Sequence, residues 1–185
     1  PKSISVISPH SACIFGARID NYSLDETLHE IEKAIKGNQR VVVANANIHA
    51  LNLAYKYPWF REFLNRSDVV FCDGVGVQLG ARLLGQRLQQ RFTPPDWLGR
   101  LAALCAERGF SIYLLGARSG VAEKAAAKLR EASPALRVAG CQHGYFDKTA
   151  GSSENEAVVA EINRLSPDLL LVGFGTPLQE RWLAD

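Results

Sequence analysis

The second half of the chain alternates between short apolar runs and longer amphipathic runs, and this order restricts the possible folds most. Short apolar runs of strand length occupy Ser111–Gly116, 136–141 and 168–173. The runs between them, at 121–131 and Ser153–Leu165, repeat their apolar residues with the period of a helix. Strands that alternate with helices in this way pair in parallel and carry helices on both faces. The sequence therefore predicts an α/β fold with a parallel sheet flanked by helices.

Capping-box patterns mark the starts of two expected helices. Ser23 with Glu26 precedes a helix expected over Leu24–Lys36, and Ser153 with Glu156 repeats the pattern. The other elements expected in the first half are strands at 40–44 and Val69–Cys72 and helices at 48–55, 57–64 and 80–88. The prolines after Thr93 should end the last of these runs, with Asp96 capping a further helix to about residue 107.

Arginines and leucines alternate along the run that follows Gly80. The basic members are Arg82, Arg87 and Arg91, and the apolar ones are Leu83, Leu84 and Leu88. A helix with this pattern suits the surface of an anionic membrane, and a helix face in water is equally consistent with it.

Polar residues stand at the ends of three expected strands. Asn45 and Asn47 follow the strand at 40–44, Asp73 follows Val69–Cys72, and Gly173-Phe-Gly-Thr-Pro-Leu-Gln-Glu ends the last strand. Carboxyl ends of parallel strands face one crevice, where Asp73 is a candidate general base and the amides suit sugar hydroxyls. The alternative is structural, because Asp-Gly is common in turns and asparagines satisfy backbone groups at strand ends.

The turn Gly116-Ala-Arg-Ser-Gly120 joins a strand to a helix. Its backbone N–H groups and the helix start, with Ser119 near the cap, suit a phosphate group. Such a turn is also routine in α/β domains.

Composition limits the classes of function. The 185 residues fit one domain, and 21 Lys and Arg against 19 Asp and Glu give a net charge of +2 without a basic block, which argues against nucleic-acid binding. The four cysteines are far apart and form no C-x-x-C pair, which indicates a reducing, cytosolic setting. The four histidines, His10 included, have no ligand spacing and no Asp-x-Asp pair is present, so we expect no metal. No apolar run reaches the roughly 18 residues of a membrane span.

The glycines after Asp73 allow a competing interpretation. Gly74, Gly76 and Gly80 follow a strand as G-x-G-x-x-x-G, and Asp96 lies twenty residues beyond Gly76, which resembles a loosened dinucleotide fingerprint. The spacing differs from the fingerprint, and Asp73 would face the pyrophosphate. An NAD-dependent oxidoreductase is therefore an alternative, as is a non-catalytic nucleotide-binding module.

Six segments taken together resemble the WecG/TagA/CpsF glycosyltransferase family. They are Asn45-Ala-Asn47, Asp73-Gly-Val-Gly, Arg91-Phe-Thr with Asp96, Ser111-Ile-Tyr-Leu-Leu-Gly, His143-Gly-Tyr-Phe and the segment from Gly173 to Glu180. The segments follow one another in the family's order and spacing, and the resemblance extends from about residue 14 to residue 182. The resemblance implies an α/β fold with a Rossmann-like half and transfer of a sugar from a UDP-sugar to a lipid-pyrophosphate-linked sugar.

The resemblance also implies roles for particular residues. Asp73 matches the general base of an inverting single displacement, and the substrate-binding positions are Asn45, Asn47, Arg91, Gly116, Tyr145 and Gln179. Family members often carry threonine in place of Asn45 and glycine in place of Pro94.

By the same resemblance, the chain is a single core domain over residues 1–185 that needs no metal and no cofactor besides the UDP-sugar donor. The donor sugar is N-acetylmannosamine, its uronic acid or glucose, and the acceptor is a polyprenyl-pyrophosphate-linked sugar for cell-surface polysaccharides. The expected location is the cytoplasmic face of the cell membrane, as a peripheral protein, with self-association into a homo-oligomer as an open alternative. Family members continue past Glu180 into an appendage for membrane contact, so we expect this chain to bind UDP and turn over slowly or not at all.

Overall fold

A computed structural model describes residues 11–185, which fall into two compact units. The first unit ends at Trp97 and the second spans Leu98–Asp185. The strands of the described residues form three sheets, β1-β2, β3-β4 and β6-β5-β7. The expectation of a single domain over residues 1–185 stays a prediction.

The first unit opens with an antiparallel hairpin that the sequence analysis did not predict. Strands β1 (Ser11–Ile14) and β2 (Ala17–Asp20) are joined by Phe15 and Gly16, both at positive φ. Two positive-φ residues make the tight turn that fits the twist of a hairpin. Its usual signal is Asn-Gly or Asp-Gly, and Phe15 in that position hid the turn.

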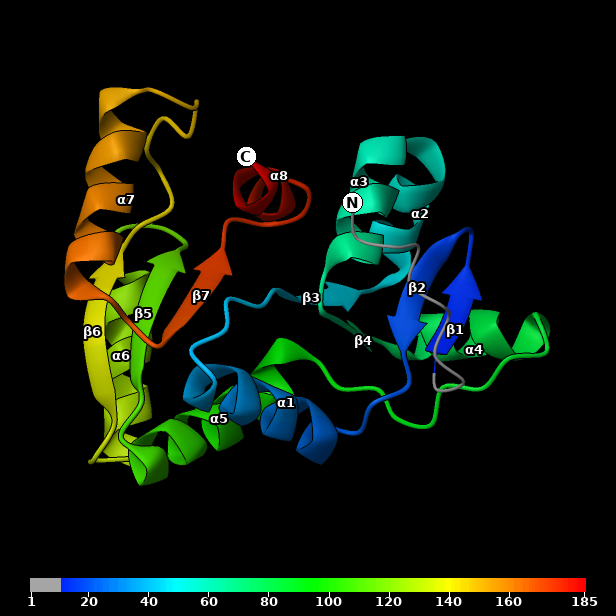
Figure 1. The fold of residues 1–185 in the computed structure, drawn as a ribbon, viewed down its shortest axis with the longest axis horizontal. Coiled ribbons are helices and arrows are strands. Elements are labelled where there is room, and N and C mark those ends of the chain that lie inside the picture. The colour runs from blue at the N-terminus through cyan, green and yellow to red at the C-terminus, as the bar shows by residue number, and fades with distance from the viewer. Residues whose placement is uncertain (1–10) are drawn as a thin grey trace. The chain divides into compact units, whose positions relative to one another are not determined.

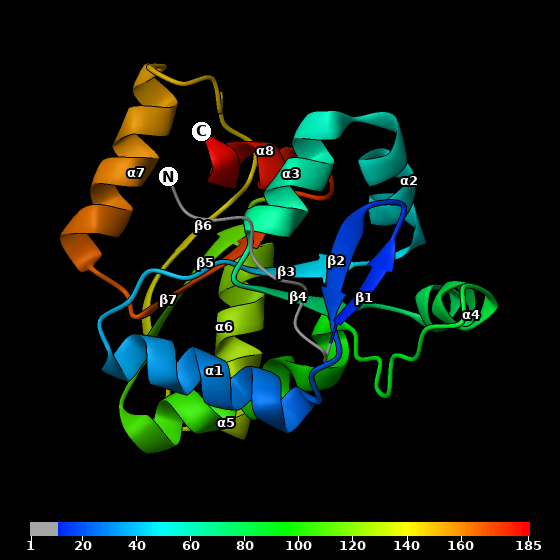
Figure 2. The same ribbon diagram turned by 45° about the vertical axis from the view of Figure 1, so that its right-hand side comes forward.

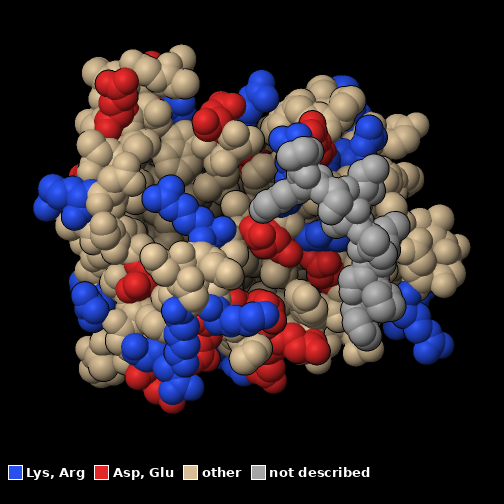
Figure 3. Space-filling model, viewed as in Figure 1, with Lys and Arg blue, Asp and Glu red and all other residues tan. Residues whose placement is uncertain are grey.

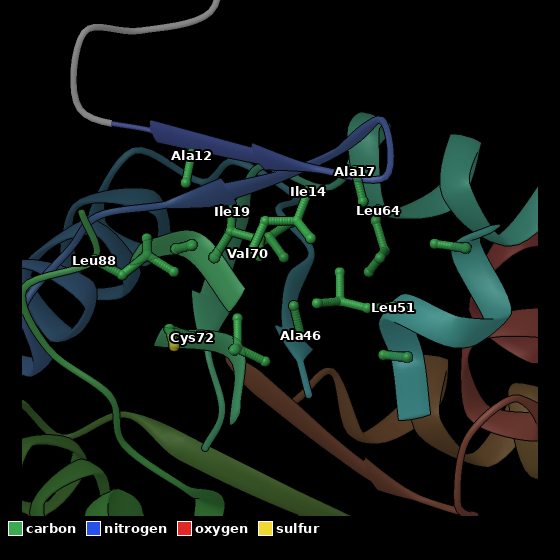
Figure 4. Close-up of a cluster of buried hydrophobic side chains, with 14 of the residues drawn as sticks. Ala12, Ile14, Ala17, Ile19, Ala46, Leu51, Leu64, Val70, Cys72 and Leu88 are labelled. Atoms are coloured by element: carbon green, nitrogen blue, oxygen red, sulfur yellow. The ribbon is translucent and has the colours of Figure 1, made fainter. Parts of the chain in front are cut away.

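The parallel pair β3 (Val43–Ala46) and β4 (Val69–Cys72) forms the floor of the core in this unit. The hairpin lies over the pair, and the apolar side chains between them form one buried cluster with α2 and α3 (Figure 4). Strand β4 has the predicted bounds, whereas β3 begins later than predicted. The reason is Asp68, whose carboxylate accepts the Val42 N–H at 2.8 Å in place of a neighbouring strand.

Three helices of the first unit follow the predicted order closely. Helix α1 (Leu24–Lys36) has both hydrogen bonds of the Ser23–Glu26 capping box, which confirms that prediction. Helices α2 (Ile48–Lys56) and α3 (Pro58–Arg66) pack together beside the β1–β2 hairpin (Figure 2). Among the described residues, no helix is long and apolar enough to cross a membrane.

The helix expected at 80–88 is wrong in its bounds. Helix α4 (Val75–Leu83) starts just after Gly74 and ends where the Gln86 side chain bonds to the backbone of Cys13. Only Arg82 of the three interleaved arginines therefore lies on a helix. The prolines after Thr93 begin α5 (Pro94–Arg108) instead of only breaking a helix, as their fixed φ allows in a first turn.

The second unit contains the predicted parallel sheet with helices on both faces (Figure 1). Its strands are β5 (Ser111–Gly116), β6 (Arg137–Gln142) and β7 (Leu169–Gly173), with β5 in the middle. Helices α6 (Val121–Ala132), α7 (Ser153–Leu165) and α8 (Leu178–Ala184) follow β5, β6 and β7 in turn. The α/β fold class with a Rossmann-like second half is confirmed.

Alternation along β5 explains the layers of this unit. Tyr113 and Leu115 are buried in a cluster with Val158 of α7, while Ile112 and Leu114 point to the other face, where α6 packs. The predicted Ser153–Glu156 capping box is off by one residue, because Ser152 is the N-cap and accepts from the Asn155 N–H.

Candidate active site

The ends of β3 and β4 bring Asp73 together with two asparagines. The Asn45 Nδ2 donates to Asp73 Oδ2 at 2.7 Å, and the Asn47 Nδ2 donates to the same oxygen at 3.4 Å. Parallel pairing sets this meeting, since Asn45 lies opposite Phe71 and Ala46 opposite Cys72, and the Asp73 N–H continues the ladder to the Ala46 carbonyl at 2.9 Å. The meeting of these two strand ends is confirmed, and their convergence with the third, at the end of the strand that closes at Gly173 in the second unit, stays a prediction.

Asn47 also begins a helix, and this fixes its amide. Its Oδ1 accepts from the Ala50 N–H at 2.9 Å as the N-cap of α2. With the oxygen committed to the helix, the Nδ2 must face Asp73.

The two carboxylate oxygens of Asp73 differ in their hydrogen bonds within residues 11–185. Both asparagines bind Oδ2, and no donor among the described residues hydrogen-bonds to Oδ1. The side chain is half-buried. Gly74 follows at φ +107 with open space where a side chain would stand, so the backbone beside the carboxylate is bare. A half-buried carboxylate with one free oxygen can take a proton from a bound hydroxyl.

Arg91 lies at the same end of β4. The Phe92 N–H donates to the Cys72 carbonyl at 3.1 Å, and the Phe92 ring stacks on Phe71 at 4.6 Å, which holds this segment beside the strand end. Burial, with the charge of Asp73 as a smaller cause, raises the pKa of the Cys72 thiol to about 11. Arg91 Nη1 is 4.0 Å from Asp96 Oδ2 and its side chain is exposed, so its guanidinium remains open to solvent and ligands.

Asp96 has a local structural role. Its carboxylate accepts the backbone N–H and the hydroxyl of Thr93, at 3.0 and 2.9 Å, and these bonds lower its pKa. Asp96 sits inside the first turn of α5 and reaches back, where the sequence analysis expected it before the helix.

In the second unit, Gly116 is at the carboxyl end of β5, directly opposite Gly173 of β7. A Cβ at Gly116, which has φ +143, would stand 2.3 Å from the Gly173 carbonyl oxygen, so only glycine fits. The chain order reverses between β5 and β7, and ligands of open α/β sheets bind at such a point.

The turn after Gly116 leaves the start of α6 without a side-chain cap. The N-cap is Gly120 at φ +80, where we expected Ser119 near the cap. The Ala117 N–H bonds to Gly173, and Arg118 is exposed in the turn. Uncapped N–H groups of a twelve-residue helix, at this edge of the sheet, suit an anionic ligand.

Tyr145 stands in the loop after β6 with an exposed ring, 71% accessible. The Gly144 N–H bonds to the Ala117 carbonyl at 2.8 Å, which places the loop beside the β5–α6 turn. Tyr145 borders a hollow of about 360 Å³ whose lining includes His143, Glu154 and Glu161.

Another hollow, of about 530 Å³, lies at the amino end of the sheet near Arg130 and Arg137, away from the carboxyl ends of β5, β6 and β7.

Lys148 holds the Tyr145 loop, and the sequence analysis missed it. Its ammonium donates to the Gly144 and Phe146 carbonyls and lies 4.5 Å from the Phe146 ring and 4.6 Å from the Phe174 ring. Phe174 follows β7, so Lys148 ties two strand-end loops together. A lone lysine in a loop has no sequence pattern that indicates this role.

Gln179 is engaged with its own loop at the start of α8. Its Oε1 accepts from the Gly175 N–H at 3.2 Å, and its Nε2 donates to Glu180 Oε1 at 3.0 Å. Glu180 is buried and also accepts from the Thr176 hydroxyl at 2.9 Å. The carboxylate of Glu180 therefore sets the direction of the Gln179 amide.

No group of three or more His, Cys, Asp or Glu side chains suited to a metal ion occurs within residues 11–185. His10 lies outside the described residues.

Comparison with known proteins identifies the family of this chain. The family described as "Glycosyl transferase WecG/TagA/CpsF family" matches residues 12–185. The chain belongs to this family, which confirms the resemblance drawn from the sequence.

Two similar curated proteins come from Staphylococcus aureus strains NCTC 8325 / PS 47 and MRSA252. Each is named N-acetylglucosaminyldiphosphoundecaprenol N-acetyl-beta-D-mannosaminyltransferase and is 28% identical over 172 residues, which cover 92% of this chain. The match covers 65% of each relative, so the chain spans a little under two thirds of their length.

Proposed function

We propose that this chain carries the catalytic base of an inverting glycosyltransferase that acts on a lipid-linked acceptor. The donor is a UDP-sugar, and the acceptor is a sugar on a polyprenyl diphosphate used for cell-surface polysaccharides. The observation that carries the proposal is Asp73, half-buried at a strand end, with Oδ2 held by two asparagines and with no hydrogen bond to Oδ1 from the part of the chain that the structure describes. Family membership supports the class of reaction.

The proposed reaction is a single displacement at the anomeric carbon. Asp73 Oδ1 takes the proton of the acceptor hydroxyl while that oxygen forms a bond to the anomeric carbon. The bond from this carbon to the diphosphate oxygen breaks, and its electron pair leaves with UDP. Asn45 and Asn47 keep the carboxylate in one orientation throughout.

The names of the relatives support N-acetylmannosamine as the donor sugar. They describe transfer of an N-acetyl-β-D-mannosaminyl group to a lipid-diphosphate-linked N-acetylglucosamine. A single displacement turns an α-linked donor into a β-linked product. Among the three donor sugars considered from the sequence, we therefore propose N-acetylmannosamine.

Protein cations and backbone dipoles are proposed to stabilise the leaving diphosphate without a metal ion. In the first unit the exposed Arg91 beside Asp73 is such a cation. The second unit has a candidate anion site of its own at the open start of α6, with Arg118 in its turn, and Tyr145 and Gln179 are proposed as ligand-binding residues of that unit. Preorganised charges of this kind stabilise a developing anion.

We also propose that the protein works at the cytoplasmic face of the membrane as a peripheral protein. The support is the chemistry of the acceptor, because a polyprenyl chain of the kind named for the relatives stays in the bilayer.

Calorimetric titration with UDP in the presence of a chelator tests the nucleotide class and the metal independence together. We expect UDP to bind the wild-type chain and the Asp73→Asn variant alike, because Asp73 is reserved for proton transfer. Binding that needs a divalent cation contradicts metal independence. Binding of NADH in place of UDP favours the oxidoreductase instead. A protein with the relatives' full length should also transfer sugar to a lipid-linked acceptor. If it binds UDP without transfer, the result favours the non-catalytic nucleotide-binding module.

A further inference from the structure

Helix α4 carries apolar residues on the face that points to water. Val77 and Ala81 are fully buried and pack into the core of the first unit. Val75, Leu79 and Leu83 follow one another at intervals of four on the opposite side and are 61, 56 and 81% exposed. A helix with water on one side normally carries polar residues there, and within residues 11–185 nothing covers these three side chains.

The turn after α4 extends the same face and is fixed in place. Leu84 is 54% exposed. The Gln86 side chain bonds the N–H and the carbonyl of Cys13 at 2.7 and 2.9 Å, and the Gln78 Nε2 donates to the Leu88 carbonyl at 3.1 Å. These bonds hold the turn against the first unit. The exposed apolar side chains of α4 and Leu84 therefore lie on a fixed surface of the fold.

The charge around this face has one sign. Residues 74–92 contain three arginines and no Asp or Glu. Arg82 and Arg87 are exposed next to the apolar residues. Figure 3 shows uncharged surface at the right-hand edge, over α4, with basic side chains beside it, whereas acidic and basic side chains mix over α1.

We propose that this α4 face, made of Val75, Leu79, Arg82, Leu83, Leu84 and Arg87, docks on an anionic lipid surface. Leucines enter the boundary between headgroups and acyl chains, and the arginines meet lipid phosphates. A symmetric pair of copies is a poorer fit, because a two-fold contact through this face brings the arginines of both copies into one patch.

Helix α4 lies next to the candidate catalytic base in the chain. The helix begins two residues after Asp73, so a membrane at α4 lies near the strand end that carries the carboxylate. The inference deepens the proposed function and rests on it here, since a lipid-linked acceptor is presented by such a surface.

Co-sedimentation with vesicles tests the docking. We expect the chain to bind vesicles of phosphatidylglycerol and phosphatidylcholine and to bind pure phosphatidylcholine at least about tenfold more weakly. The double variant Leu79→Gln/Leu83→Gln should lose about tenfold or more in binding to the mixed vesicles. The double variant Arg82→Gln/Arg87→Gln should lose about tenfold as well and lose most of the salt dependence.

Matched controls use outward residues of the second unit. Val159→Gln on α7 removes an exposed apolar residue away from α4, and Lys124→Gln/Lys128→Gln on α6 removes the same charge as the arginine variant. Both controls should bind vesicles like the wild type. Equal binding by the α4 variants and the wild type overturns the proposal. So does a dimer, seen by sedimentation velocity, that the leucine variant dissociates while vesicle binding is unchanged. UDP titration of the wild-type chain separates the two hypotheses, because a wild-type chain that binds UDP and binds no vesicles removes only the docking.

Discussion

Asn47 joins the start of a helix to the candidate base with a single side chain. Its oxygen caps α2 and its nitrogen contacts Asp73, so the two functions of one amide depend on different atoms. Variants can therefore separate them.

Replacing Asn47 by serine or alanine should separate activity from stability. Serine keeps an N-cap oxygen and loses the Nδ2, whereas alanine loses both. We expect turnover to fall about ten- to a hundredfold in both variants, the value of a hydrogen bond to a charged group. The free energy of unfolding should fall by about 1 kcal/mol in Asn47→Ala only. Steady-state kinetics and urea denaturation measure the two effects, and full turnover in Asn47→Ser would contradict the role given to the Nδ2.

The variant Asp73→Asn should lower turnover by about 10² to 10⁴, because the proton acceptor is lost while the shape is kept. The assay requires a protein with the relatives' full length, a UDP-sugar donor and a lipid-linked acceptor. Asp25→Asn, in the first turn of α1, is the matched control and should turn over normally. Unchanged turnover in Asp73→Asn would remove Asp73 from the mechanism.

Sequence patterns predicted the residues at the ends of β3 and β4 because parallel pairing fixes where strand ends meet. Asn45, Asn47 and Asp73 were found in this way. Lys148 was not, because its contacts to Gly144 and Phe174 depend on loop paths that carry no periodic signal.

Among the elements, β5 and β7 pair two glycines at their carboxyl ends. Gly116 and Gly173 face each other without side chains, which brings the backbone of both turns to the point where the chain order reverses.

Gly116→Ala should destabilise the chain by about 1–3 kcal/mol, because the new methyl group would meet the Gly173 carbonyl and the backbone would have to shift. Gly120→Ala is the control, since Gly120 also has a positive φ but open space around it, and it should cost about 1–2 kcal/mol. Urea denaturation followed by circular dichroism compares the two. A smaller loss in Gly116→Ala than in Gly120→Ala would argue against the close approach.

Elements were predicted best where a local signal agreed with the tertiary structure. The capping box of α1 and the buried strand β5 kept their predicted bounds. The run at 80–88 has leucines at helical spacing, but Gln86 forms bonds to a distant strand and the helix stops before it. A periodic pattern of residues close in sequence does not predict long-range contacts of this kind.

At the scale of the whole molecule, buried cysteine thiols should react more slowly than exposed ones. Burial raises the pKa of Cys105 to about 11, like that of Cys72, and also raises the pKa of Cys141, whereas Cys13 is exposed. At pH 8 a thiol with a pKa near 11 has about one thiolate in a thousand, and only the thiolate reacts.

Iodoacetamide at pH 8 should therefore modify the native chain first at Cys13 and modify all four cysteines after denaturation. Peptide mass spectrometry identifies the sites. Rapid labelling of Cys72 or Cys105 in the native chain would show that the cores open more easily than their packing indicates.

The β1–β2 hairpin has a consequence for how the protein is made. Its backbone and side chains bond to residues far along the chain, with Asp20 50 residues from Val70 and Cys13 73 residues from Gln86. A ribosome adds about 5–20 residues per second, so the hairpin waits roughly 4–15 s for its last partner. During translation its apolar side has no native cover, and we expect the nascent chain to be a client of ribosome-bound chaperones until β4 and the turn after α4 emerge.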